Sequence, residues 1–247
     1  MKIGIIGAGQ IGSSLARKLS SIGNHVLVAN SREPATIKSI ADEAGASAVT
    51  VSDVVKDVDL VIVAIPERNI PDLPKDLFDQ VSCDVIVVDT GNYYPGSRAD
   101  AIAEIESGMP ESQWVSRQLG RPVVKAFNTI LAHSLATKGM PDGIEDRIAI
   151  PVSGDDPYTK KIVTDLIGAI GFDGIDAGTI AESWRQQPGT PACCSDLQAD
   201  GLRRALSLAD KAQAPHLRDL ILQKMAQLQA GFTTKDLIDI NRAIHNL

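Results

Sequence analysis

Cysteine is scarce in this chain of 247 residues, which contains Cys83, Cys193 and Cys194 and no other cysteine. Their number and spacing form neither a disulfide framework nor a CxxC motif, the patterns of small secreted domains and of thioredoxin-like redox sites. The adjacent pair Cys193–Cys194 has two interpretations: two small residues in a loop, or a redox-active pair. This cysteine usage is typical of a cytoplasmic protein.

Long apolar runs are also missing. No run reaches the roughly 18 residues that a membrane-spanning helix needs, so we expect no membrane contact. The first apolar stretch is too short for a signal peptide and leads directly into a glycine-rich loop. Both observations favour a cytoplasmic location.

Positive charge is in deficit, with 24 Lys and Arg against 31 Asp and Glu and a net charge of −7. A chain of this balance has no broad basic surface, which argues against nucleic acid as a partner. A phosphate-bearing ligand would therefore be held by local geometry. The sequence also lacks a Ser/His/Asp arrangement and any metal-ligand cluster, so we assign no catalytic residue and no metal.

A strand–glycine loop–helix–strand unit opens the chain. Residues 1–6 predict a short buried strand, residues 11–22 an amphipathic helix, and residues 25–29 a second apolar strand. The loop Gly7-Ala8-Gly9-Gln10-Ile11-Gly12 has the GxGxxG spacing of dinucleotide-binding folds. Gly7 permits the tight turn, Gly9 lets a pyrophosphate approach the backbone, and Gly12 lets the helix pack closely. The helix then points its free N–H groups at the phosphates.

The end of the second strand selects the cofactor. NAD enzymes usually place Asp or Glu there, whereas this chain has Asn30, Ser31 and Arg32. Arg32 offers a forked cation and Ser31 a hydroxyl for a 2′-phosphate, and Lys38 adds charge nearby. We therefore expect NADP rather than NAD. Alternatively, Arg32 is a solvated surface charge or pairs with Glu33.

The remaining pattern predicts an α/β fold, a doubly wound parallel sheet of the Rossmann type with a small helical C-terminal segment. Continuous apolar runs are typical of strands covered on both faces. Further strands are expected at 48–51, 60–64, 85–89, 122–128, 148–152 and 172–176, and helices at 34–44, 52–58, 99–106, 114–119 and 156–170.

Ligands of such sheets lie beyond the carboxyl ends of the strands. Ala64, Ile65 and Pro66 should therefore line the nicotinamide half of the cleft, unless they only end their strand. Asn92 and Asn128 are polar residues at the same edge. His133, a few residues further on, is a candidate on the substrate side, although a lone histidine is more often structural.

The C-terminal part is helical, with helices expected at 197–212, 216–229 and 235–244 and a cap at Thr233 or Thr234. We divide the chain into a dinucleotide-binding domain at 1–180 and a helical segment at 181–247. This segment could cover the cleft or build a subunit interface.

Several of these motifs together resemble the NADP-dependent deazaflavin oxidoreductase family. Its name-giving members pass hydride between NADP and coenzyme F-420, an 8-hydroxy-5-deazaflavin, and the reductase domains of the STEAP metalloreductases are similar. The resemblance covers roughly residues 1 to 191. It rests on GxGxxG, Asn30-Ser31-Arg32, Ala64-Ile65-Pro66, Val124-Lys125-Ala126-Phe127-Asn128-Thr129, Gly171-Phe172-Asp173-Gly174-Ile175-Asp176-Ala177-Gly178 and Pro188-Gly189-Thr190-Pro191.

The resemblance implies roles for further residues. Gly7, Gly9, Gln10, Ile11 and Gly12 would hold the pyrophosphate, with Ser31 and Arg32 on the 2′-phosphate. The stretches 64–66 and 126–128, the latter being Ala126, Phe127 and Asn128, would flank the nicotinamide. Gly189 and Thr190 are further candidates on the substrate side. The family also implies a homodimer.

The acceptor stays open at this level. A flat flavin-like or deazaflavin co-substrate would stack on the nicotinamide, and the protein would mainly position two cofactors. Two departures bear on it: the helical tail after about Ser195, and Gln187, which stands before Pro188 where many relatives carry Glu. The alternatives are an NADP-dependent reductase of a small hydroxyacid or imine, and a non-catalytic NADP sensor whose tail binds a partner.

Overall fold

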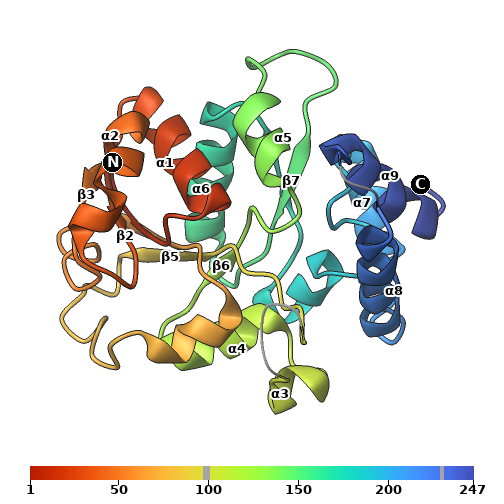
Figure 1. Ribbon diagram of the computed structural model, residues 1–247, viewed down its shortest axis with the longest axis horizontal. Coiled ribbons are helices and arrows are strands. Elements are labelled where there is room, and N and C mark those ends of the chain that lie inside the picture. Colours follow the sequence, from red (N-terminus) through yellow and green to blue (C-terminus); the bar gives the residue numbers. More distant parts are fainter. Residues whose placement is uncertain (97–100, 229–230) are drawn as a thin grey trace.

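The computed structural model describes residues 1–96, 101–228 and 231–247. Figure 1 shows a sheet with helices above and below it in the N-terminal part of the chain, and the last helices, in blue, grouped together at one end. The N-terminus lies at the opposite end of this view from the C-terminus.

Within the described residues, the larger sheet has six strands in the order β3-β2-β1-β4-β5-β6, and all neighbouring strands in it are parallel. This is the doubly wound order of the Rossmann fold. The predicted fold class is therefore confirmed. The strands are β1 (Lys2–Ile6), β2 (His25–Ala29), β3 (Ser47–Ala48), β4 (Leu60–Val63), β5 (Ile86–Asp89) and β6 (Val124–Lys125).

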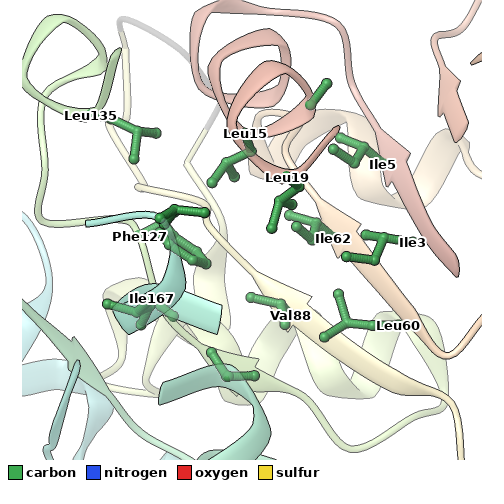
Figure 2. Close-up of a cluster of buried hydrophobic side chains, with 14 of the residues drawn as sticks. Ile3, Ile5, Leu15, Leu19, Leu60, Ile62, Val88, Phe127, Leu135 and Ile167 are labelled. Atoms are coloured by element: carbon green, nitrogen blue, oxygen red, sulfur yellow. The ribbon is translucent and has the colours of Figure 1, made fainter. Parts of the chain in front are cut away.

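One face of this sheet packs against α1 (Gln10–Ser21), α5 (Ala132–Thr137) and α6 (Pro157–Ala169). Figure 2 shows how side chains from the strands and from these helices meet in one cluster. Its labelled members are Ile3, Ile5, Leu15, Leu19, Leu60, Ile62, Val88, Phe127, Leu135 and Ile167.

The other face packs against α4 (Glu111–Leu119) and the 3-10 helix η2 (Glu67–Asp72). Val61 and Val63 point to this side, whereas Leu60 and Ile62 point to the first one. Alternate side chains of a strand point to opposite faces, so a strand buried on both sides needs an unbroken apolar run.

Several predicted helices differ from the structure, among them the one expected at 197–212, which is observed at 199–207. Residues 51–57 form turns, because both Val54 and Val55 are buried and the backbone at Val54 packs directly on Gly4 of β1. The predicted helix 34–44 divides into the 3-10 helix η1 (Pro34–Ile37) and α2 (Lys38–Ala44). The helix predicted at 99–106 is observed as α3 (Ala103–Glu106), and its expected start at Ala99 lies outside the described residues.

The last two strands pair with each other. β7 (Ala149–Val152) and β8 (Asp173–Asp176) form a separate two-stranded parallel sheet, and α6 lies between them in the chain. One antiparallel bridge joins this sheet to β6: Lys125 N donates to Ser153 O at 2.8 Å, and Ser153 N donates to Lys125 O at 3.0 Å. The small sheet therefore extends the large one beyond its β6 edge.

The C-terminal segment is helical, as predicted, and consists of α7 (Ala199–Ser207), α8 (Ala214–Ala226) and α9 (Thr234–Ile244). α7 packs against the small sheet, where Leu202 and Ala205 meet Ala149 and Ile175 in a third apolar cluster. The 3-10 helix η3 (Ile180–Gln186) leads into the segment. The predicted end of the second helix at Gln229 lies outside the described residues.

α9 has a local cap at its start and a contact with the segment that precedes α7. Thr233, one of the two predicted caps, accepts a hydrogen bond from Asp236 N in a capping box at the start of α9. Arg242 on α9 donates to the backbone carbonyls of Ser195 and Asp196 at 2.8 and 3.0 Å.

The division at residue 180 and the homodimer stay predictions. In the part of the chain that is described, no helix is long and apolar enough to cross a membrane.

Candidate functional site

The three glycines of the loop after β1 serve different purposes in the structure. Gly7 has φ +118°, a conformation that favours glycine, and a Cβ there would collide with the carbonyl of Ala64. A Cβ on Gly12 would collide with the carbonyl of Gly7. Gly9 differs, because a Cβ placed on it meets no atom within 4 Å. Gly7 and Gly12 are thus needed for packing, and Gly9 faces open space.

The N-terminus of α1 is free to bind an anion. Gly9 is its N-cap residue, and no side chain within the described residues caps the helix. The N–H groups of Gln10, Ile11 and Gly12 belong to the first turn, where an α-helix has no internal acceptors for them. These N–H groups and the positive end of the helix dipole fit a pyrophosphate.

The loop after β2 presents Ser31 and Arg32 to solvent. Asn30 shapes this loop: its Oδ1 accepts from Arg32 N at 2.9 Å, and its Nδ2 donates to Thr36 Oγ1 at 3.2 Å. Both Ser31 and Arg32 are exposed, and among the described residues no ion pair joins Arg32 to Glu33. The guanidinium of Arg32 is therefore available for a 2′-phosphate.

Lys38 is less available than Arg32. It lies at the start of α2, and its Nζ is 2.6 Å from Asp42 Oδ2, one turn further along the helix. This pair is exposed, so it is a weak interaction that a phosphate could disrupt.

The exit of β4 lies directly beside the glycine loop. Ala64 N donates to Ile6 O at 2.8 Å, and Ala64 O is the atom that a side chain on Gly7 would strike. Ala64, Ile65 and Pro66 are all partly exposed. Their position next to the loop agrees with the predicted nicotinamide half of the cleft.

The exits of β5 and β6 are joined by a network of amides. Asn92 Nδ2 donates to Asn128 O at 2.8 Å, while Asn128 Nδ2 donates to Asn92 Oδ1 at 3.0 Å and to Gln186 O at 2.6 Å. Gln186 Nε2 in turn donates to Asn128 Oδ1 at 3.0 Å. Asn128, Ala126 and Phe127 are buried, and the amide of Asn128 is fully used inside the protein. These three residues therefore lie beneath the surface at the strand exits. Asn92 is more exposed than Asn128, its hydrogen-bond partner.

The three substrate-side candidates are not brought together. His133 is exposed on α5, which packs against α1. Gly189 has φ +86°, and a Cβ there would collide with Ala214 O at the start of α8. Thr190 is 1% exposed, and its hydroxyl donates to Gln187 O at 2.8 Å. Gly189 therefore lets the start of α8 approach the loop closely, and Thr190 stabilises the loop itself.

A buried charge cluster lies behind the strand exits, and sequence reasoning missed it. Lys125 on β6 is 0% exposed, and its Nζ donates to Asp89 Oδ2 at 3.1 Å and to Gly91 O at 2.5 Å. Glu111, the first residue of α4, has its Oε2 3.8 Å from the same ammonium. Glu67, which follows Pro66, is buried as well, and its Oε1 borders Gly91. The available signal was a lysine inside the otherwise apolar stretch 122–127.

Two groups in this cluster, Glu111 and Lys125, have raised pKa values. Burial, together with the neighbouring charges of Glu67 and Asp89, raises the pKa of Glu111 well above its usual range, although Lys125 and the backbone N–H of Tyr93 act against this. Burial alone would lower the pKa of Lys125, but the charges of Asp89, Glu111 and Glu67 outweigh it and raise that pKa. These shifts favour the charged form of Lys125 and the protonated form of Glu111.

The adjacent cysteines are free thiols, with their sulfur atoms 3.5 Å apart. The hydrogen bond to Cys194 and burial raise the pKa of Cys193 well above its usual value. A thiol that keeps its proton is a poor nucleophile, so the geometry favours two small loop residues over a redox-active pair.

The doubly wound sheet, the uncapped helix after a GxGxxG loop and the exposed Ser31-Arg32 pair together define a dinucleotide-binding Rossmann protein. Residues 2–93 match the family described as "NADP oxidoreductase coenzyme F420-dependent". The chain belongs to this family of NADP-dependent oxidoreductases.

Three individual proteins illustrate what this chain is similar to. The "Putative protein YjhV" of Escherichia coli (strain K12) is 38% identical over 106 residues, which cover 43% of this chain and 77% of that protein. The crystal structure of a hypothetical protein, SMa0349, from Sinorhizobium meliloti is similar with a TM-score of 0.68 and 34% identity, over 81% of this chain and 96% of that one. The structure of "a putative f420 dependent nadp-reductase" from Arthrobacter sp. FB24 shares the fold, with a TM-score of 0.59 and 24% identity over 74% of this chain and 87% of that one.

Proposed function

We propose that this protein transfers hydride between NADP(H) and a flat flavin-like or deazaflavin acceptor. The observation that carries the proposal is the open space at Gly9, in front of the uncapped N-terminus of α1. A pyrophosphate fits there without displacing any side chain. The bound nicotinamide supplies the hydride, and the residues of the chain hold and orient it.

Two groups of residues would bind two different parts of NADP, the pyrophosphate and the 2′-phosphate. Gln10, Ile11 and Gly12 would donate their backbone N–H groups to the pyrophosphate. Ser31 and Arg32 would bind the 2′-phosphate. Lys38, at the start of α2, would add positive charge nearby. The partly exposed stretch 64–66 and Asn92 would then border the nicotinamide.

Replacing Arg32 by alanine is expected to weaken NADPH binding at least about tenfold, since a hydrogen bond to a charged group contributes about 1.5–3 kcal/mol. Binding of NADH should change little, because it has no 2′-phosphate. Fluorescence titration with both cofactors measures this. The matched control is Arg117→Ala, an exposed arginine on α4. Equal losses for NADPH and NADH would refute the role of Arg32.

Turnover tests the reaction. We expect purified protein to oxidise NADPH, followed by its absorbance, when FMN or the deazaflavin is added, and Arg32→Ala to require more NADPH for the same rate. Turnover of NADP with small 3-hydroxy acids, but not with either flat acceptor, would instead support a hydroxyacid or imine reductase. Tight NADPH binding without any turnover would support the sensor.

A further inference from the structure

A cavity of about 300 Å³ lies outside the predicted NADP site. It is bordered by the end of α3, the start of α4, η3 with the residues after it, and the start of α8. None of the residues that we assign to NADP lines it. Its size is at the lower end of small-molecule sites and suits a single ring with one substituent.

Two polar atoms at this cavity have no hydrogen-bond partner. Gln187 Nε2 and Glu111 Oε2 are both buried, and neither makes a hydrogen bond with any described residue, although Glu111 Oε2 lies 3.8 Å from the ammonium of Lys125. Both residues line the cavity. A buried polar group without a partner is unfavourable, and its presence in a folded protein asks for an explanation such as a missing ligand.

Both atoms act as donors. Gln187 Nε2 is an amide nitrogen. Burial and the carboxyl groups of Glu67 and Asp89 raise the pKa of Glu111 against the opposing effect of Lys125, which favours the protonated carboxyl, a hydrogen-bond donor. The ligand that completes them must therefore carry an oxygen acceptor.

The charged side chains at the cavity favour an anion. Lys211 is exposed and forms no ion pair within the described residues, and its Nζ lies 6.0 Å from the centre of the Trp184 ring. The guanidinium carbon of Arg218 lies 5.6 Å from the centre of the Tyr93 ring, and Arg218 Nε donates to Asp219 Oδ1 at 2.9 Å. On the acidic side, Glu106 also lines the cavity, and it interacts with the Tyr93 hydroxyl.

The walls favour a flat body. Trp184 is partly exposed, and the apolar side chains of Met109, Pro188 and Pro215 share the lining with it. A ring stacked on the indole would be held by apolar contact, while its anionic group reaches the cations and the two donors.

We propose that this cavity, which Glu111, Trp184, Gln187, Lys211 and Arg218 line, binds a small aromatic carboxylate. One carboxylate oxygen accepts from Gln187 Nε2 and Glu111, and the charge is balanced by Lys211 and Arg218. The site is distinct from the NADP site, so it holds or fails independently of the proposed function.

Calorimetric titration of the full chain with benzoate tests this site. We expect saturable binding of one benzoate per chain, and at least about tenfold weaker binding by Gln187→Leu, which removes the amide but keeps the volume. Because Gln187 Nε2 is unpartnered in the free protein, this variant should not melt at a lower temperature than the wild type. Lys211→Ala should weaken binding about threefold to tenfold, whereas Lys224→Ala, an exposed lysine on α8 outside the cavity, should not.

Three outcomes would overturn the proposal: no saturation with benzoate, wild-type affinity in Gln187→Leu, or equal binding of the cationic benzylamine. NADPH titration of the same samples keeps the two sites apart. Loss of NADPH binding with intact benzoate binding would count against the proposed function alone.

Discussion

Replacing Lys125 by methionine is expected to lower the free energy of unfolding by about 3–5 kcal/mol. Methionine keeps the length of the side chain but removes its charge. Lys125 is fully buried, and its ammonium is 3.1 Å from Asp89 and 3.8 Å from Glu111. Without it, the carboxylate of Asp89 loses its cationic partner and Gly91 O loses its donor, in a place that water does not reach. Urea denaturation followed by circular dichroism measures the change.

Two variants serve as controls for Lys125→Met. Lys56→Met removes an ammonium from an exposed pair with Asp53, whose side chains are 62% and 52% exposed, and should change stability by no more than about 1 kcal/mol. Glu111→Gln replaces a carboxyl whose raised pKa favours the neutral form by a neutral amide of similar shape, so it should cost less than about 1.5 kcal/mol. If Lys125→Met were as mild as Lys56→Met, Lys125 would not be compensating a buried charge.

Replacing Gly9 by valine is expected to weaken NADPH binding at least about a hundredfold, which corresponds to the loss of one or two hydrogen bonds to a charged phosphate. The fold should be kept, since Gly9 has φ −75° and a Cβ there meets no atom within 4 Å. The valine side chain would fill the space through which the pyrophosphate reaches the first turn of α1. Fluorescence titration with NADPH and thermal unfolding measure the two effects separately.

Gly168→Val on α6 is the matched control, because a Cβ at Gly168 also meets no atom within 4 Å. It should leave NADPH binding unchanged. Gly12→Val marks the opposite case: it should destabilise the protein, since its side chain would collide with Gly7 O. Wild-type affinity for NADPH in Gly9→Val would mean that the dinucleotide binds elsewhere.

Local patterns predicted the first half of the fold well. β2 begins and ends at the predicted residues, β1 and α1 differ by one residue at their ends, and the six-stranded order confirms the doubly wound sheet. The signals are strong because an apolar strand, a glycine turn and an amphipathic helix depend on neighbours within about thirty residues. Where distant parts of the chain contact a segment, as Gly4 contacts Val54, the predicted helix at 52–58 did not form.

The site divides in the same way. The surroundings of Gly7, Gly9 and Gly12 differ as their spacing indicates, whereas phosphate binding at Gly9, Ser31 and Arg32 stays a prediction. The roles of Gly189 and Thr190 could not be read from their motif, because the contact of Gly189 with Ala214 depends on how α8 returns to the loop.

By itself, the sequence determined that this protein has a Rossmann fold with an N-terminal dinucleotide loop, since both follow from short-range periodicity and from glycine at three positions. Only the tertiary structure decided which charges are buried together. Glu67, Asp89, Glu111 and Lys125 lie in four separate segments, and each alone is an ordinary charged residue. The raised pKa values of Glu111 and Lys125 arise from mutual approach and exclusion of water, which depend on how β4, β5, β6 and α4 pack. The cavity beside Glu111 likewise exists because the C-terminal helices close over Gln187.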